Sequence, residues 1–345
     1  MKRGWQILLT VSLALMAMIW SLPTARAAKT TANNVGYSVR PILPANQMSK
    51  RISYFDLRAK PGQTQRLQVV VDNTSNRSQK FRVSVNQAVT NDNGVIDYSQ
   101  LKPQRDSSLK VGITDIFGKH ATQTITIPAN AQKRVTVSYT LPAKKFRGII
   151  LGGVYVAQLQ PKSAQSTSKI MIRNMFAYAI GVSIQEGATV KPDLKLNQVT
   201  ATQINARNFV AANLQNFQPG LLQHLTVNAR VTQVGNDQTV ISQKQAQMGM
   251  APNSNFDFGI PWGNQQLKAG TYTLYLTAKS GDQQWRFVRN FTINAPTIKR
   301  LNRHALTPTR PNYLLYLALL LLIAILLAII GYLIYRNRHP QDDSK

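Results

Sequence analysis

The feature that most constrains this chain is an uncharged apolar run near its C-terminus, LLYLALLLLIAILLAIIGYLI, at residues 314–334. At a rise of about 1.5 Å per residue, about 20 such residues cross a hydrocarbon core about 30 Å thick. Four tyrosines near its ends suit the membrane–water interface: Tyr313, Tyr316, Tyr332 and Tyr335. We therefore predict one transmembrane helix over residues 313–335, held in a lipid bilayer. A buried core helix or a removable tail signal is the alternative.

A second apolar segment lies at the N-terminus. Lys2 and Arg3 precede an apolar stretch at residues 5–22, and Ala25-Arg26-Ala27 offers the small residues that a signal peptidase recognises. We predict a secretory signal peptide over residues 1–27, with an uncleaved anchor as the alternative. The two ends together place the protein in the cell membrane, with residues 28–312 extracellular and the tail, residues 336–345, cytoplasmic.

The charge of the chain is strongly basic. It has 41 Lys and Arg residues against 13 Asp and Glu residues, and the part predicted to be exported keeps 35 against 11. Such an excess attracts polyanions. Export favours teichoic acids or acidic lipid head groups over nucleic acid, for which the chain lacks an aromatic platform pattern. A basic surface with no specific ligand is the alternative.

The exported part shows the alternation of half-buried strands. At residues 64–72 and 79–88, apolar and polar side chains alternate with a period of two, and Asn93-Gly94 predicts a tight turn. Gly152-Gly153 predicts a bulge or a close backbone approach. About seven short strands per half, with no long amphipathic helix, predict an all-β fold of two tandem immunoglobulin-like β-sandwich domains.

The expected boundaries follow from composition. The sandwiches are predicted at residues 35–159 and 170–296, and the polar segment 160–169 between them reads as a linker or a long hairpin loop. Residues 297–312 are basic and contain prolines, so we predict a stalk that leads to the membrane helix. Since the chain has no cysteine, packing alone must hold both cores together.

The sequence lacks the residue patterns that an exported enzyme needs for catalysis. There is no cysteine, and His120, His224 and His304 do not stand at ligand spacing from one another or from an acid. The sequence has no glycine-rich phosphate loop and no G-x-S-x-G elbow. We therefore predict a binding protein that is not an enzyme and uses no metal or cofactor.

Two groups of residues are candidates for ligand contact. Two basic clusters suit an anionic or saccharide polymer. The first is Lys50, Arg51, Arg58 and Lys60 together with Tyr54 of the aromatic pair Tyr54-Phe55, and the second is Lys144, Lys145 and Arg147. Solvated charges around a core strand are the alternative. Phe256, Phe258 and Trp262 alternate with polar or small residues, so they form either a partner-binding aromatic patch or the inner face of a strand.

Several short segments of the chain form a recognisable set. In the first half they are Arg40-Pro41, Asn46-Gln47, Tyr54-Phe55-Asp56-Leu57, Pro61-Gly62-Gln63 and Val69-Val70-Val71-Asp72-Asn73. In the second half they are Met250-Ala251-Pro252-Asn253-Ser254-Asn255-Phe256 and Leu267-Lys268-Ala269-Gly270-Thr271-Tyr272. Together these segments resemble the WxL-interacting protein family of Gram-positive surfaces.

The resemblance implies a first domain that binds peptidoglycan and a second that binds host extracellular proteins. It also implies association with surface proteins that carry the WxL wall-binding domain. The favoured hypothesis is a membrane-anchored binding protein that contacts the wall through its first domain. The alternative is a purely structural membrane dock for a secreted WxL-protein complex. The resemblance transfers no contact residues.

Overall fold

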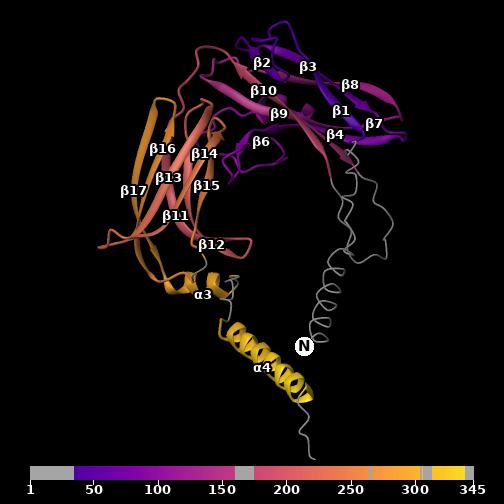
Figure 1. Cartoon of the computed structure of the whole chain (residues 1–345). Helices are drawn as coiled ribbons and strands as arrows, with labels where there is room; N and C mark the ends of the chain where they lie inside the picture. The colour runs from indigo at the N-terminus through magenta and orange to yellow at the C-terminus, as the bar shows by residue number, and fades with distance from the viewer. Residues whose placement is uncertain (1–34, 160–174, 264–265, 304, 306–312, 339–345) are drawn as a thin grey trace, which may run out of the picture.

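The computed structural model describes residues 35–159, 175–263, 266–303, 305 and 313–338 (Figure 1). The predicted signal peptide at 1–27, the expected linker at 160–169 and most of the tail, residues 339–345, lie outside the described residues. Strands dominate the described part, so the all-β prediction is confirmed.

The first sandwich consists of two facing sheets, with strand orders β1-β3-β8 and β2-β10-β9-β4-β7. The strands are β1 (Tyr37–Ile42), β2 (Phe55–Arg58), β3 (Thr64–Asn73), β4 (Gln79–Gln87), β7 (Thr122–Ile127), β8 (Ala131–Thr140), β9 (Ile149–Leu159) and β10 (Ala177–Gln185). The predicted alternation is confirmed, because Leu67 and Val69 of β3 face Phe81 and Val83 of β4 in one core. A short helix, α2 (Ile113–Phe117), and the 3-10 turn η1 (Gly118–Ala121) precede β7.

Strand β10 corrects the expected boundary between the two halves. It pairs antiparallel with β9 and parallel with β2, so it belongs to the first sandwich (Figure 1). Segment 160–169 therefore joins two neighbouring strands of one sheet, and the chain passes to the second sandwich after Gln185. Composition alone does not separate a polar hairpin loop from a polar linker, because both are solvated.

The second sandwich consists of a three-stranded sheet, β11-β12-β15, that packs against a four-stranded sheet, β14-β13-β16-β17. Its strands are β11 (Leu194–Ile204), β12 (Arg207–Asn216), β13 (Leu222–Gln233), β14 (Thr239–Met250), β15 (Ser254–Pro261), β16 (Gly270–Ser280) and β17 (Gln283–Ile293). Side chains from both sheets fill its separate core, among them Leu214 and Phe258 from one sheet and Val227 and Leu274 from the other.

Two helices follow the second sandwich. Helix α3 (Ala295–Arg303) begins where we expected the stalk, but Leu301 is buried in the second core and Asn302 hydrogen-bonds the backbone of Leu267. The start of the predicted stalk is therefore part of the sandwich, and residues 306–312 lie outside the description. Helix α4 (Tyr313–Arg338) is long and apolar enough to cross a membrane, with a mean hydropathy of 3.1 over Tyr316–Tyr335.

The two sandwiches meet at a seam beside a short hairpin of the first, β5 (Val89–Thr90) and β6 (Ile96–Asp97). Ala88 and Leu151 of the first sandwich pack there with Ala251 of the second in a small core of their own. The predicted turn at Asn93-Gly94 is confirmed: the Gly94 N–H donates to the Asn91 carbonyl, and the Gly94 carbonyl accepts from Gly249 of β14. The tip of the hairpin is thus fixed against the second sandwich.

Candidate functional site

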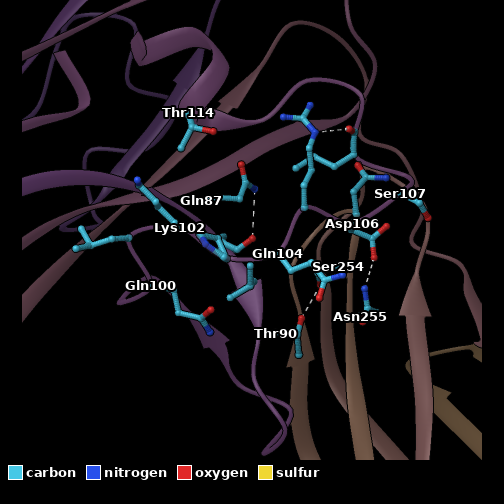
Figure 2. A pocket seen from close by; sticks show the side chains of 17 residues that line it. Gln87, Thr90, Gln100, Lys102, Gln104, Asp106, Ser107, Thr114, Ser254 and Asn255 are labelled. Carbon is cyan, nitrogen blue, oxygen red and sulfur yellow. Dashed lines mark hydrogen bonds between the residues drawn. The ribbon is translucent and has the colours of Figure 1, made fainter. Parts of the chain in front are cut away.

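A network of buried polar side chains joins the sandwiches at the seam. Asp106 is only 7% exposed, and its carboxylate accepts hydrogen bonds from Gln215 Nε2 and Asn255 Nδ2, both at 2.5 Å. The Thr90 and Ser254 hydroxyls lie 2.6 Å apart, a hydrogen bond drawn as a dashed line in Figure 2. These contacts connect residues more than 100 positions apart in the sequence, so they hold the sandwiches in one orientation.

Asp106 stays ionised in this buried place because its partners stabilise the charge. Burial by itself raises the pKa of the carboxyl group, but hydrogen bonds from Ser108, Asn255 and Gln215 outweigh it, and the pKa lies below its ordinary value. Two of these donors come from the second sandwich. The charge of Asp106 is therefore tied to the docking of the two sandwiches.

A polar cavity of about 610 Å³ opens beside this network (Figure 2). Gln87, Gln100, Gln104 and Thr114 of the first sandwich line it together with Ser254 and Asn255 of the second. Its lining is rich in amides and hydroxyls, each of which both donates and accepts hydrogen bonds.

A basic cleft of about 600 Å³ lies on the other side of the segment that contains Asp106. Lys110, Lys144, Lys145 and Arg147 line it from the first sandwich, and Phe217, Pro219 and Asn253 line it from the second. No carboxylate is among its described lining residues. The cleft therefore combines positive charge with a partly apolar wall, an arrangement that suits an anionic polymer.

The structure brings three of the predicted basic residues, Lys144, Lys145 and Arg147, into this cleft and places Arg58 and Lys60 near it. The Arg58 guanidinium donates to the Gly187 carbonyl at 2.9 Å, and a side chain at 187 would lie 3.5 Å from Lys145 Nζ. The turn that contains Lys60 contacts the segment before Lys144, because the Gly62 N–H donates to the Pro142 carbonyl. The two basic clusters, about 85 positions apart in the sequence, thus meet at one edge of the first sandwich.

Glu186 supports the basic cleft from behind. Its side chain is 8% exposed, and its Oε2 atom accepts the backbone N–H of Phe146, between Lys145 and Arg147. Among the described residues its Oε1 atom has no hydrogen-bond partner. The only glutamate of the chain therefore orders the loop that carries three of the predicted cations. Sequence reasoning assigned it no role, because nothing in its local sequence places it beside residue 146.

Lys50, Arg51 and Tyr54 precede strand β2, whereas Arg58 is its last residue and Lys60 follows it. Lys50, Arg51 and Tyr54 are exposed, and Tyr54 lies on the outer face of the sheet against Gly181.

Gly153 pairs with Gly181, and a side chain at 153 would lie 2.9 Å from Tyr98 Cδ1. The predicted close approach at Gly152-Gly153 is confirmed. A Cβ atom at 152 would collide with the Asn86 carbonyl oxygen and Ile113, and one at 153 with Tyr98; sequence reasoning missed these partners.

The prediction of an exposed aromatic patch is wrong. Phe256, Phe258 and Trp262 are 3%, 1% and 5% exposed, and all three belong to the second core. The two phenylalanines occupy alternate positions of β15, so both point inward. Trp262 packs edge-on against Tyr272 and donates its indole N–H to the Gln266 carbonyl. These residues stabilise the sandwich and are not free to contact a partner.

Two family models match consecutive parts of the chain. The model described as WxL Interacting Protein, peptidoglycan binding domain, matches residues 37–158. The model described as WxL Interacting Protein, host binding domain, matches residues 167–303. Their boundary lies in the loop between β9 and β10, whereas the sheet hydrogen bonds keep β10 in the first sandwich.

Similar solved structures include bacterial fimbrial chaperones. The class 5 fimbriae chaperone CfaA is 13% identical, with 75% of this chain and 100% of that chain covered at a TM-score of 0.27. The YadV chaperone is 10% identical, with the same coverage and a TM-score of 0.29. A PapD-like domain of human CEP192 is 13% identical and covers 49% of this chain and 97% of its own, with a TM-score of 0.26. The comparison with curated proteins found no match.

Proposed function

Because the chain belongs to the WxL-interacting protein family, we propose that it is a membrane-anchored cell-surface protein that holds an anionic wall polymer in its basic cleft. The observation that carries the proposal is the convergence of Lys110, Lys144, Lys145 and Arg147 on one cleft without a described carboxylate. Arg and Lys side chains form charge-assisted hydrogen bonds with phosphate or carboxylate groups. Both family descriptions name binding, which supports a binding role.

Purified cell walls provide the test. We expect the full chain in detergent to be retained on walls at about 0.01 M salt and released at about 1 M, where the Debye length falls from about 30 Å to about 3 Å. A triple variant, Lys144→Gln, Lys145→Gln and Arg147→Gln, should lose at least ten-fold in retention.

A matched variant separates a site from general charge. Lys80, Lys133 and Arg134 are exposed on the first sandwich and do not line the cleft, so changing all three to Gln removes the same charge elsewhere. This control should keep most of its retention. Equal losses in the two triple variants, or no retention of the unchanged protein at low salt, would overturn the proposal.

The anchor in this proposal is α4. Every described side chain between Tyr316 and Tyr335 is exposed, and no apolar neighbour among the described residues covers the helix. A lipid bilayer is the environment in which such a helix is stable. The full chain should stay in the membrane pellet after an alkaline carbonate wash and enter solution only with detergent. Release by carbonate alone would contradict the anchor.

The second sandwich is proposed to present a surface to host proteins or to WxL-domain surface proteins. Its aromatic residues 256, 258 and 262 are buried, so the contact must use another face. The outer face of β14-β13-β16-β17 carries Val288, which is 65% exposed, and the Arg230 guanidinium lies 4.5 Å from the Tyr275 ring centroid. Val288→Asp should weaken capture of such a partner, whereas unchanged capture would exclude this face.

A further inference from the structure

The outer face of the three-stranded sheet in the second sandwich carries amide side chains in register. Lys195, Gln215 and Asn255 form one row across β11, β12 and β15, and Asn213 and Asp257 pair in the next. Asn197, at the β-bulge of β11, reaches the same row as Asn213. We refer to Asn197, Asn213, Gln215, Asn255 and Asp257 as the amide face.

Hydrogen bonds hold the amide face in a fixed arrangement. Asn197 Nδ2 donates to Asn213 Oδ1 at 2.8 Å, and Asn213 Nδ2 donates to Asp257 Oδ1 at 2.7 Å and to Asn255 Oδ1 at 3.2 Å. The side chains are therefore oriented before any ligand arrives, which lowers the entropic cost of binding.

A hollow of about 570 Å³ lies over this face. The first sandwich contributes Asp92, Gln104 and Ser107 to its rim. Gln104, Ser107 and Gln198 make no side-chain hydrogen bond to other described residues, and Asp257 uses only one carboxylate oxygen. Hydrogen-bonding groups from both sandwiches are thus available to a ligand.

The charge of the hollow differs from that of the rest of the chain. On a protein with a net charge of +28, its described lining has two carboxylates, Asp92 and Asp257, and one cation, Lys195. A polyanion therefore has no electrostatic reason to prefer it. A divalent cation is also not favoured, because calcium takes 6–8 oxygen ligands and Asn213 Nδ2 already donates to Asp257 Oδ1 and Asn255 Oδ1.

An apolar platform continues the same face. Phe209 is half-buried on β12, and its ring lies over Gly259 of β15, where a side chain would come within 3.3 Å of Phe209 Cδ1. Phe209 precedes Asn213 by four residues, or about 14 Å along a strand at about 3.4 Å per residue. Flat apolar surface and oriented amides thus lie on the same face of the sheet, about 14 Å apart.

We propose that the amide face and its hollow bind an uncharged, hydroxyl-rich oligosaccharide. Each sugar hydroxyl both donates and accepts, and so pairs with an amide or with the free oxygen of Asp257. The C–H face of a sugar ring lies well on an aromatic ring such as Phe209. The site is independent of the basic cleft, because the two lie on opposite sides of one segment of the first sandwich. Asp106 and Ser107 face the polar side of this segment, whereas Ser108 and Lys110 face its basic side.

Calorimetric titration of the full chain tests this proposal, in a detergent without a sugar head group that would compete. The probes are hexa-N-acetylchitohexaose, which represents N-acetylated wall sugars, and lacto-N-tetraose, which represents glycans of animal cell surfaces. An uncharged hexapeptide of Ser, Asn and Gln represents a protein ligand. We expect at least one sugar to bind, with little change between about 0.01 M and about 1 M salt.

Two double variants locate the binding. Gln104→Ala with Gln198→Ala removes one rim amide from each sandwich and should lower sugar affinity at least ten-fold. Gln284→Ala with Asn290→Ala removes two amides from β17, on the opposite sheet, and should leave it unchanged. The tighter sugar identifies the source of the ligand. Binding of neither sugar, equal effects of the two variants, or tighter binding of the peptide would overturn the proposal.

Discussion

The Asp106 carboxylate of the first sandwich accepts a 2.5 Å hydrogen bond from the Gln215 amide of the second, and both side chains are more than nine-tenths buried. A charge in this position is stable only while the donors of the second sandwich remain in place. The contact therefore couples the ionisation of one side chain to the relative placement of the two sandwiches. Both candidate sites include residues from each side of the seam, so their shape depends on this contact.

The first prediction concerns acid. Because the folded pKa of Asp106 lies below its ordinary value of about 3.9, its ionised form stabilises the fold fully above that value. This stabilisation is lost as the pH falls through the folded pKa. Asp106→Asn replaces an acceptor by a donor that faces Gln215 or Asn255, and should cost about 1–3 kcal/mol at neutral pH. Thermal unfolding of both proteins between about pH 7 and about pH 3 should show the gap closing as the pH falls. A constant gap contradicts the linkage.

The second prediction concerns the inward aromatics. Phe258→Ala leaves a cavity in the second core and should lower the free energy of unfolding by about 3–5 kcal/mol. Val288→Ala, on an exposed side chain, should stay within about 0.5 kcal/mol. Denaturant titration followed by tryptophan fluorescence measures both. A Phe258 variant as stable as the Val288 variant is incompatible with a core position.

The third prediction concerns the boundary. A fragment of residues 35–159 lacks β10, so the facing edges of β2 and β9 are unpaired. Unpaired edge strands promote aggregation. A fragment that continues to residue 187 keeps β10 and should be soluble and cooperative in thermal unfolding, whereas the shorter one should aggregate. Equal behaviour of the two fragments in size-exclusion chromatography argues against a structural role for β10.

The fourth prediction concerns close contact at the seam. Gly148 has φ of +74°, and a Cβ atom there would collide with the Pro219 carbonyl oxygen of the second sandwich. Gly235 has φ of +80° with no atom within 4 Å of such a Cβ, so it carries the same backbone strain without the collision. Gly148→Ala should therefore lower the melting temperature more than Gly235→Ala. Equal decreases in melting temperature for the two variants would mean that backbone strain, and not the collision with Pro219, causes the loss of stability.

The strands were largely predictable because alternation needs only neighbouring residues. Phe81 and Val83 are buried, as the period of two requires. On the other face of β4, Ser84 and Asn86 are also buried, because other parts of the first sandwich cover them, and local sequence does not show this. The aromatics of β15 were ambiguous for the same reason. Alternation shows that they share a face but not which face is covered.

The candidate sites were predictable only in part. Lys144, Lys145 and Arg147 were recognisable as a basic run, but Arg58 joins them through Gly187, about 130 positions further along the chain. Lys110 has no basic neighbour in sequence and was missed. The amide face was also missed, since its members lie on three strands and come together only through strand register.

By itself the sequence determined the strand-rich fold, the apolar C-terminal helix and the excess of positive charge. These properties depend on composition and on the spacing of residues a few positions apart. The tertiary structure alone decided that β10 completes the first sheet, that residues 256, 258 and 262 point inward, and that Asp106 meets Gln215. Those relationships join residues distant in the sequence. They depend on which surfaces are in contact once both cores have formed, which no local pattern encodes.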